Sequence, residues 1–187
     1  PVGNGAMIAV LGLETEELQK FIKKNETSKG ICEIANDNAT GQVIVSGDRK
    51  KIDQIQINLK EEKIKTIPLK VSAPFHCSLM KPAAEEMKIK IDKTIFKKSS
   101  IDIVNNVKAD VESDPNKVKK LLVEQIFSTV RWRESLLFME KAGIKNFIEI
   151  GPGKALSGMV KRTIKNVNCF SINSIADIKN MINELKK

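Results

Sequence analysis

The one histidine of this chain is its best candidate for proton-transfer chemistry. His76 follows Ala73-Pro74-Phe75, between a stretch typical of a strand and one typical of a helix. Proline disfavours helical backbone at the residue before it, so the histidine should lie where the strand ends. Side chains at such junctions reach a sheet edge, where ligands tend to bind. Because imidazole exchanges protons near neutral pH, His76 could act as a general base and acid, although a surface or structural histidine would show the same local pattern.

The cysteines do not predict a disulfide framework or a metal site. Cys32, Cys77 and Cys169 are odd in number and far apart, which favours a reducing, cytoplasmic setting. No Cys-x-x-Cys pair exists and the chain has a single histidine, so no metal is expected. Cys77 adjoins the histidine, but a neighbouring side chain points elsewhere on a regular backbone, so it is not predicted to be a nucleophile.

The basic charge leaves three explanations open. The formal net charge of +9 comes mostly from lysines spread along the expected helices, and it fits a lysine-rich surface, an acidic partner or nucleic acid. RNA binding would need exposed aromatic residues on strands. The chain has no tyrosine and only 4% aromatic residues, so no nucleic-acid partner is expected. No run of ~18 apolar residues predicts a membrane span.

Residues 5–71 have the pattern of a βαββαβ unit. Hydrophobic spacing predicts strands and helices at Ala6–Leu11, Glu14–Lys24, Ile31–Ala35, Gln42–Val45, a segment capped by Asp48, and Ile64–Val71. The turn-forming residues Asn36–Gly41 should join the two middle strands, and Pro68 indicates an edge strand. This element order is that of a ferredoxin-like subdomain.

Residues 72–187 have the pattern of an α/β domain. Leu79, Ala83, Met87, Ile91 and Ile95 recur every four residues and predict a helix with an apolar stripe. Strands are expected at Ile101–Val107, Phe147–Ile150 and Cys169–Ile172, and further helices after Asp114, at Trp132, after Lys154 and after Ser174. Three strands are few for five helices in a sheet covered on both faces, which predicts that more of this domain lies outside the chain.

Several separated motifs then resemble one family, the malonyl-CoA:acyl-carrier-protein transacylases of fatty-acid biosynthesis. Ser72–Pro82 is similar to the family's histidine motif, and the similarity extends from Gly5 onward. The other matching segments, in the family's order, are Asn36–Gly47, Val104–Val107, Leu122–Gln125, Val130–Trp132 and Glu149–Leu156. The glycines of Gly151–Lys154 could also cradle a phosphate, but a structural turn is the favoured interpretation.

The resemblance implies a fold and a mechanism. The family has an α/β-hydrolase-like acyltransferase domain with an inserted ferredoxin-like subdomain, so residues 5–71 would be that subdomain and residues 72–187 the C-terminal part of the large domain. A serine would attack malonyl-CoA, and the phosphopantetheine thiol of acyl carrier protein would then collect the malonyl group. His76 would be the general base and acid, oriented by the backbone carbonyl of Gln125. Malonyl-CoA would be a substrate, and no cofactor is expected.

The resemblance also implies substrate contacts. Phe75 would exclude an α-methyl group and so select malonyl over branched substrates, or it could simply be core. Asn36, Asn38 and Gln42 match positions at the entrance for CoA or the carrier's phosphopantetheine, where amides offer donors and acceptors; ordinary turn residues are the alternative. Lys65 matches a basic position facing the carrier protein, and a solvated lysine would look the same.

The serine nucleophile of the family is not found in this chain. No Gly-x-Ser-x-Gly elbow occurs in the sequence. The chain alone should therefore be inactive, as a truncated form or as one piece of a split enzyme whose N-terminal half is another chain. A non-catalytic carrier-protein-binding module is the alternative function.

Overall fold

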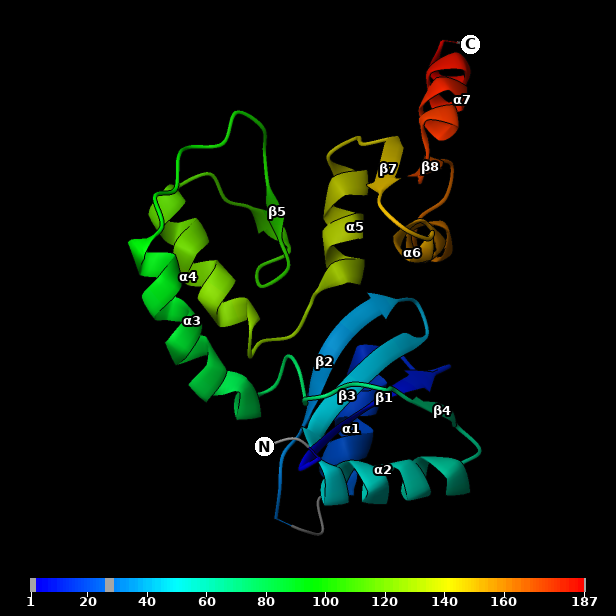
Figure 1. Ribbon diagram of the computed structural model, residues 1–187. Helices are drawn as coiled ribbons and strands as arrows, with labels where there is room; N and C mark the ends of the chain where they lie inside the picture. Colours follow the sequence, from blue (N-terminus) through cyan, green and yellow to red (C-terminus); the bar gives the residue numbers. More distant parts are fainter. Residues whose placement is uncertain (1–2, 26–28, 187) are drawn as a thin grey trace. The chain divides into compact units, whose positions relative to one another are not determined.

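The computed structural model describes residues 3–25 and 29–186 (Figure 1). The chain divides into two compact units, Pro1–Ser135 and Leu136–Lys187. Within the part of the chain that the structure describes, none of the helices combines the length and the hydrophobicity that a membrane span requires.

A four-stranded antiparallel sheet is the centre of the first unit. Its strands occur in the order β2-β3-β1-β4 across the sheet. The elements are β1 (Gly5–Leu11), α1 (Thr15–Lys24), β2 (Cys32–Ala39), β3 (Gln42–Asp48), α2 (Arg49–Glu61) and β4 (Lys65–Pro68). The element order expected for this stretch is the one observed, and Pro68 lies on an edge strand as expected.

Both helices cover one face of this sheet (Figure 1). Leu18 of α1 and Ile52, Ile55 and Leu59 of α2 are fully buried, because their spacing places them on the helix faces that meet the sheet. They pack against strand residues such as Val43. The opposite face carries a smaller apolar cluster, built on Met7, Ala9, Ala35 and Ile44.

The hairpin between β2 and β3 differs from the sequence prediction. Asn36–Ala39 belongs to strand β2, not to a turn, and only Thr40 and Gly41 connect the strands. Two register shifts interrupt the pairing of β2 with β3. Such bulges allow turn-forming residues to remain in a strand, so composition was misleading here. Strand β4 is also shorter than Ile64–Val71.

The remainder of the first unit is mainly helical. It contains η1 (Ser78–Met80), α3 (Lys81–Lys93), β5 (Val104–Asn105), β6 (Asp110–Val111), α4 (Pro115–Gln125) and the start of α5 (Trp132–Lys141). Asp114 caps α4 as expected, accepting hydrogen bonds from the amides of Asn116 and Lys117. The strand predicted at Ile101–Val107 is wrong except for its two paired residues.

The apolar stripe predicted for α3 is only partly buried. Ala84, the buried residue of this helix, is outside the predicted stripe, whereas Met87 in the stripe is 49% exposed and Ile95, beyond the helix end, is 87% exposed. On α4, Leu121 is the buried residue. The four-residue spacing therefore identified helix α3 correctly, but not the surface that it buries.

The second unit contains a parallel strand pair. Strands β7 (Asn146–Ile150) and β8 (Asn168–Ile172) pair in parallel, with α6 (Ala155–Thr163) between them and α7 (Ile175–Leu185) after them. Ser174 caps α7 by accepting a hydrogen bond from the amide of Asp177, as expected. The strand prediction at Phe147–Ile150 is confirmed, and Ile150 at its end is 82% exposed.

Candidate active site

His76 lies in a short loop between β4 and η1 and has an unusual backbone. Its φ angle is +58°, in the left-handed region, which costs a non-glycine residue about 1–3 kcal/mol. Such a conformation persists only where neighbouring contacts hold it. The next residue, Cys77, is fully buried, and its thiol donates to the carbonyl oxygen of Pro74 at 3.1 Å.

The part of this loop just before the histidine packs directly on strand β1. A Cβ atom at Gly5 would lie 2.4 Å from the ring of Pro74, closer than any stable contact. The absence of a side chain at Gly5 therefore allows Pro74 to approach the sheet, and this contact fixes the loop just before the histidine.

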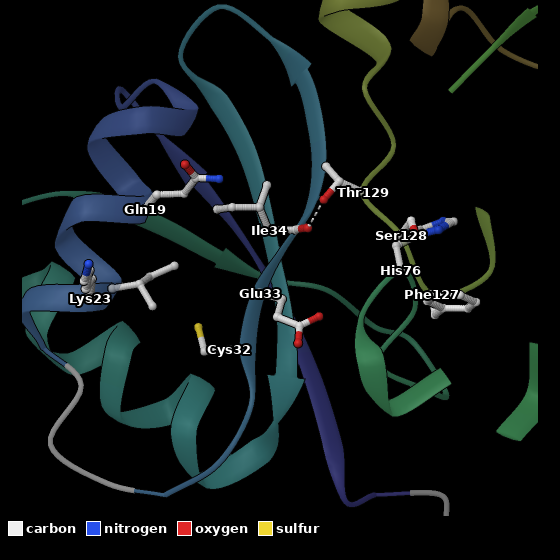
Figure 2. Close-up of a pocket in the computed structure, with 10 residues that line it drawn as sticks. Gln19, Lys23, Cys32, Glu33, Ile34, His76, Phe127, Ser128 and Thr129 are labelled. Atoms are coloured by element: carbon white, nitrogen blue, oxygen red, sulfur yellow. Dashed lines mark hydrogen bonds between the residues drawn. The ribbon is translucent and has the colours of Figure 1, made fainter. Parts of the chain in front are cut away.

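The His76 ring is oriented by the end of helix α4. Its Nδ1 atom lies 2.9 Å from the carbonyl oxygen of Gln125, the last residue of the helix. A carbonyl oxygen can only accept, so Nδ1 carries the proton in this contact, and Nε2 of the neutral ring has a free lone pair. The arrangement leaves one nitrogen of His76 available to take a proton. Figure 2 shows the ring at the side of an open cavity.

This cavity has a volume of about 470 Å³. Cys32, Glu33 and Ile34 of β2 line one side, and His76 and residues 127–129 line the other (Figure 2). Gln19, Ile22 and Lys23 of helix α1 complete the lining. The space next to the histidine is therefore lined by both polar and apolar side chains.

The segment after Gln125 is attached to the free edge of β2. Thr129 Oγ1 donates to the carbonyl of Ile34 at 2.6 Å, and the amide of Val130 donates to the carbonyl of Ala35 at 2.8 Å. The amide of Asp37 in turn donates to the carbonyl of Val130 at 2.9 Å. These bonds, which form the bridge between Asn36 and Val130, connect the orienting helix to the sheet.

An ion pair reinforces this attachment. The guanidinium of Arg133 forms hydrogen bonds to both carboxylate oxygens of Asp37, at 2.9 and 3.0 Å from Nε. The Asp37 side chain is 3% exposed and that of Arg133 is 18% exposed. Removing one partner of a pair so well shielded from water is costly because it leaves a charge without its main compensation; a second carboxylate, that of Glu14, lies 4.0 Å from Arg133 Nε.

The predicted amide residues lie along the β2–β3 hairpin, away from the cavity lining. Asn36 takes part in the bridge to Val130, and Asn38 is 8% exposed. Gln42 begins β3, and its Oε1 atom is buried without a hydrogen-bond partner among the described residues. A buried acceptor of this kind is suited to a donor from a ligand.

The other predicted substrate residues are both exposed. Phe75 is 37% exposed and precedes the histidine, so it is not a core residue. Lys65 begins the edge strand β4 and pairs with Leu11 of β1. Neither residue lines the cavity that contains the His76 ring.

The thiols near the site are poor nucleophiles. Burial raises the pKa of Cys77 above its ordinary value, and burial raises the pKa of Cys32 to about 12. Thiols with raised pKa values are little ionised at neutral pH and react slowly. Among the described residues, no group of three or more histidine, cysteine or carboxylate side chains has an arrangement that could hold a metal ion.

One site residue was missed by sequence reasoning. The Glu33 carboxylate accepts hydrogen bonds from the amide of Ser78 at 2.8 Å and from its hydroxyl at 2.6 Å. Glu33 is 45 residues away in sequence, so no local pattern points to this contact. In the sequence, the only sign of a site role for Glu33 was an acidic side chain next to the apolar Ile34 in an expected strand.

The glycine turn at residues 151–154 is structural. The carboxylate of Glu149 accepts hydrogen bonds from the amides of Leu156 and Ser157 in the first turn of α6. Gly153 donates its amide to Asn173 Oδ1 at 2.7 Å. A carboxylate from within the unit thus occupies the amides that an anion would use at this helix N-terminus.

Comparison with known proteins identifies the relatives of this chain. No protein-family model matches it. A malonyl CoA-acyl carrier protein transacylase of Bacillus subtilis is 38% identical over the whole chain, and one of Haemophilus influenzae is 34% identical over 94% of it. The chain is homologous to malonyl CoA-acyl carrier protein transacylases. It spans only 59% and 56% of these two relatives.

Solved structures of malonyl transacylases also match this chain. The crystal structure of the Clostridium perfringens transacylase matches the whole chain with a TM-score of 0.94 at 34% identity, and the chain covers 58% of it. A malonyl transacylase solved in complex with the acyl carrier protein of a type II polyketide synthase matches 98% of the chain with a TM-score of 0.92 at 31% identity, and 60% of that protein is covered. The fold is therefore the α/β fold of these transacylases.

Proposed function

We propose that this chain provides the histidine half of a malonyl transfer site. The reaction would move a malonyl group from malonyl-CoA to the phosphopantetheine thiol of acyl carrier protein. The contact between His76 and the Gln125 carbonyl carries the proposal, because it fixes the tautomer that a general base needs. The homology to malonyl transacylases supplies the reaction class.

The chemistry follows from the position of the free lone pair. Nε2 of His76 would remove the proton from a serine hydroxyl as the serine oxygen attacks the malonyl carbonyl. The same nitrogen would return that proton to the departing CoA sulfur, which leaves a malonyl ester on the serine. In the second half, Nε2 would take the proton of the carrier thiol, the thiol would attack the ester, and the serine would recover its proton.

The serine would come from outside these residues. The chain matches little more than half of its relatives, and we infer that it corresponds to their C-terminal part. Residues 5–71 would then be a ferredoxin-like subdomain and residues 72–187 part of an α/β-hydrolase-like domain. On this basis the chain alone would be inactive, and it would work in the cytoplasm beside the other enzymes of fatty-acid synthesis.

The remaining predicted residues would contact the substrates. Phe75 would limit the size of the acyl group. Gln42, whose buried Oε1 has no partner among the described residues, would accept a hydrogen bond from the pantetheine arm, with Asn36 and Asn38 beside it on the same hairpin. Lys65, exposed on the edge strand, would face the acidic carrier protein.

A joined protein tests this function. The chain would be fused behind the part of the Bacillus subtilis relative that it does not match, and malonyl transfer to phosphopantetheinylated carrier protein would be measured by mass spectrometry. His76→Ala should reduce the rate by ~10²–10⁴-fold, while Lys97→Ala, at an exposed position, should leave it unchanged. Full activity of the His76→Ala protein would refute the proposed role.

A carrier-binding module without catalysis is the second candidate, favoured by the net charge of +9. It predicts salt-sensitive binding of an acidic carrier by the chain alone, because salt screens attraction between exposed charges. Such binding with no transfer in the joined protein would favour this candidate over the enzyme.

A further inference from the structure

The hydrogen bonds between Glu33 and Ser78 lie beside the strained histidine. Ser78 is two residues after His76, and both its amide and its hydroxyl donate to the Glu33 carboxylate. Glu33 and His76 also line the same cavity, from facing sides (Figure 2). The contact therefore connects strand β2, at the edge of the sheet, to the loop that contains His76, the candidate base.

The left-handed backbone of His76 explains why this contact matters. At φ +58° the residue would relax unless the chain on both sides were held. Before the histidine, Pro74 packs on Gly5. After it, Cys77 is buried and Ser78 is held by Glu33.

The two hydrogen bonds from Ser78 reach different oxygens of the same Glu33 carboxylate. A carboxylate oxygen accepts at 2.8 Å from the Ser78 amide and the other accepts at 2.6 Å from the Ser78 hydroxyl. Two bonds to one residue fix its orientation as well as its distance, and bonds to an ionised acceptor are stronger than neutral ones. The amide of Ser78 is also the first of turn η1, which leads into α3.

We propose that Glu33 is a positioning residue for His76. It holds Ser78, and through Ser78 the left-handed backbone that directs Nδ1 of the histidine to the Gln125 carbonyl. Glu33 does not take part in proton transfer itself. The proposal rests on the proposed function for its catalytic consequence, but its structural consequence can be measured on the chain alone.

Nitrogen NMR provides that measurement, because the chain contains one histidine. In alkaline buffer, ring ¹⁵N shifts distinguish a neutral imidazole protonated at Nδ1 from one protonated at Nε2. The wild-type chain should show the Nδ1–H form. Glu33→Ala and Ser78→Ala should each shift the population toward the Nε2–H form. Glu33→Gln should retain the wild-type form, because its amide can accept from the Ser78 amide and donate to the Ser78 hydroxyl.

Controls separate positioning from general damage. Glu61→Gln and Glu61→Ala, at an exposed position at the end of α2, should leave the ring signals unchanged. If Glu33→Ala prevents folding, Ser78→Ala tests the positioning role instead. It keeps the hydrogen bond from the backbone amide of residue 78 to Glu33 and removes only the one from the hydroxyl. Folded Glu33→Ala or Ser78→Ala chains that keep the wild-type ring signals would overturn the proposal.

The joined protein distinguishes this inference from the proposed function. Glu33→Ala should lower the rate of malonyl transfer by ~10²-fold, the scale of a slightly misplaced catalytic group, and Glu33→Gln should restore most of it. A large loss with His76→Ala and none with Glu33→Ala would reject the positioning role and keep the function. No loss with His76→Ala would reject the function, whatever the ring signals show.

Discussion

The carbonyl oxygen of Gln125 lies 2.9 Å from Nδ1 of His76, although the two residues are 49 positions apart. In the proposed function, the last residue of α4 would have the task of the aspartate in a serine–histidine–aspartate triad. A backbone carbonyl is neutral, so it fixes the ring tautomer without adding a charge beside the ring. Any side chain at position 125 can provide it.

The first prediction concerns Gln125 itself. Gln125→Ala should retain the ring tautomer of His76 and change malonyl transfer in the joined protein by no more than about threefold, because its backbone carbonyl remains. The loss of the bond from Gln125 Nε2 to the Ser128 carbonyl should lower the free energy of unfolding by about 1 kcal/mol. Rate assays and urea titration measure the two effects, and a hundredfold loss of rate without unfolding would show that the side chain is needed.

The second prediction concerns the ion pair between Asp37 and Arg133. Asp37→Ala removes the nearer carboxylate from a largely shielded guanidinium and leaves it only the weaker contact with Glu14 at 4.0 Å, so it should lower the free energy of unfolding by about 3 kcal/mol. The matched control is Asp92→Ala in the Lys88–Asp92 pair, whose side chains are both 53% exposed; it should change stability by about 0.5 kcal/mol or less. Equal effects in urea unfolding would contradict the structural importance of Asp37.

The third prediction concerns substrate choice. Phe75→Ser in the joined protein should reduce the preference for malonyl-CoA over methylmalonyl-CoA by at least ~10-fold, the scale of one methyl group in a pocket. Because Phe75 is already 37% exposed, the change should have little effect on stability. Competition assays with both substrates measure the ratio, and unchanged selectivity would exclude Phe75 as a selector.

The fourth prediction concerns acid stability. Hydrogen bonds from the amide and hydroxyl of Ser157 lower the pKa of Glu149 in the folded chain. The stabilisation is complete above the unfolded-state pKa of about 4.3 and is lost as pH falls through the lower folded value. Glu149→Gln should therefore show a smaller loss of thermal stability than the wild type when the pH is lowered from neutral to about 2.5, which lies well below the unfolded-state pKa. Identical pH profiles would show that Glu149 does not contribute.

The elements of this fold were largely predictable because their signals are local. The helices after Asp114 and Ser174 were predicted correctly, and each of these side chains caps its helix by binding amides only two or three residues away. The strand through Asn36–Ala39 was missed because its support is distant: Asp37 is bound by Arg133, 96 positions later. Asp48 begins α2 as predicted, but its carboxylate binds the amide of Ile31 in place of the helix.

The candidate site, like the fold, could be predicted only in part from the sequence. His76 could be proposed from its residue type and its place between a predicted strand and a predicted helix, and the resemblance to a family indicated Gln125. Glu33 could not be found, because nothing near it in sequence shows that its carboxylate meets Ser78. The left-handed backbone of His76 was equally hidden, since histidine itself gives no sign of a positive φ angle.

Intact mass spectrometry with malonyl-CoA tests the central claim most directly. The chain alone and the joined protein would each be incubated with malonyl-CoA and weighed. We predict a malonyl adduct on a serine of the added segment in the joined protein, slower to form with His76→Ala, and no adduct on the chain alone. An adduct on the chain alone would contradict the account, because a nucleophile within residues 1–187 would then perform the attack.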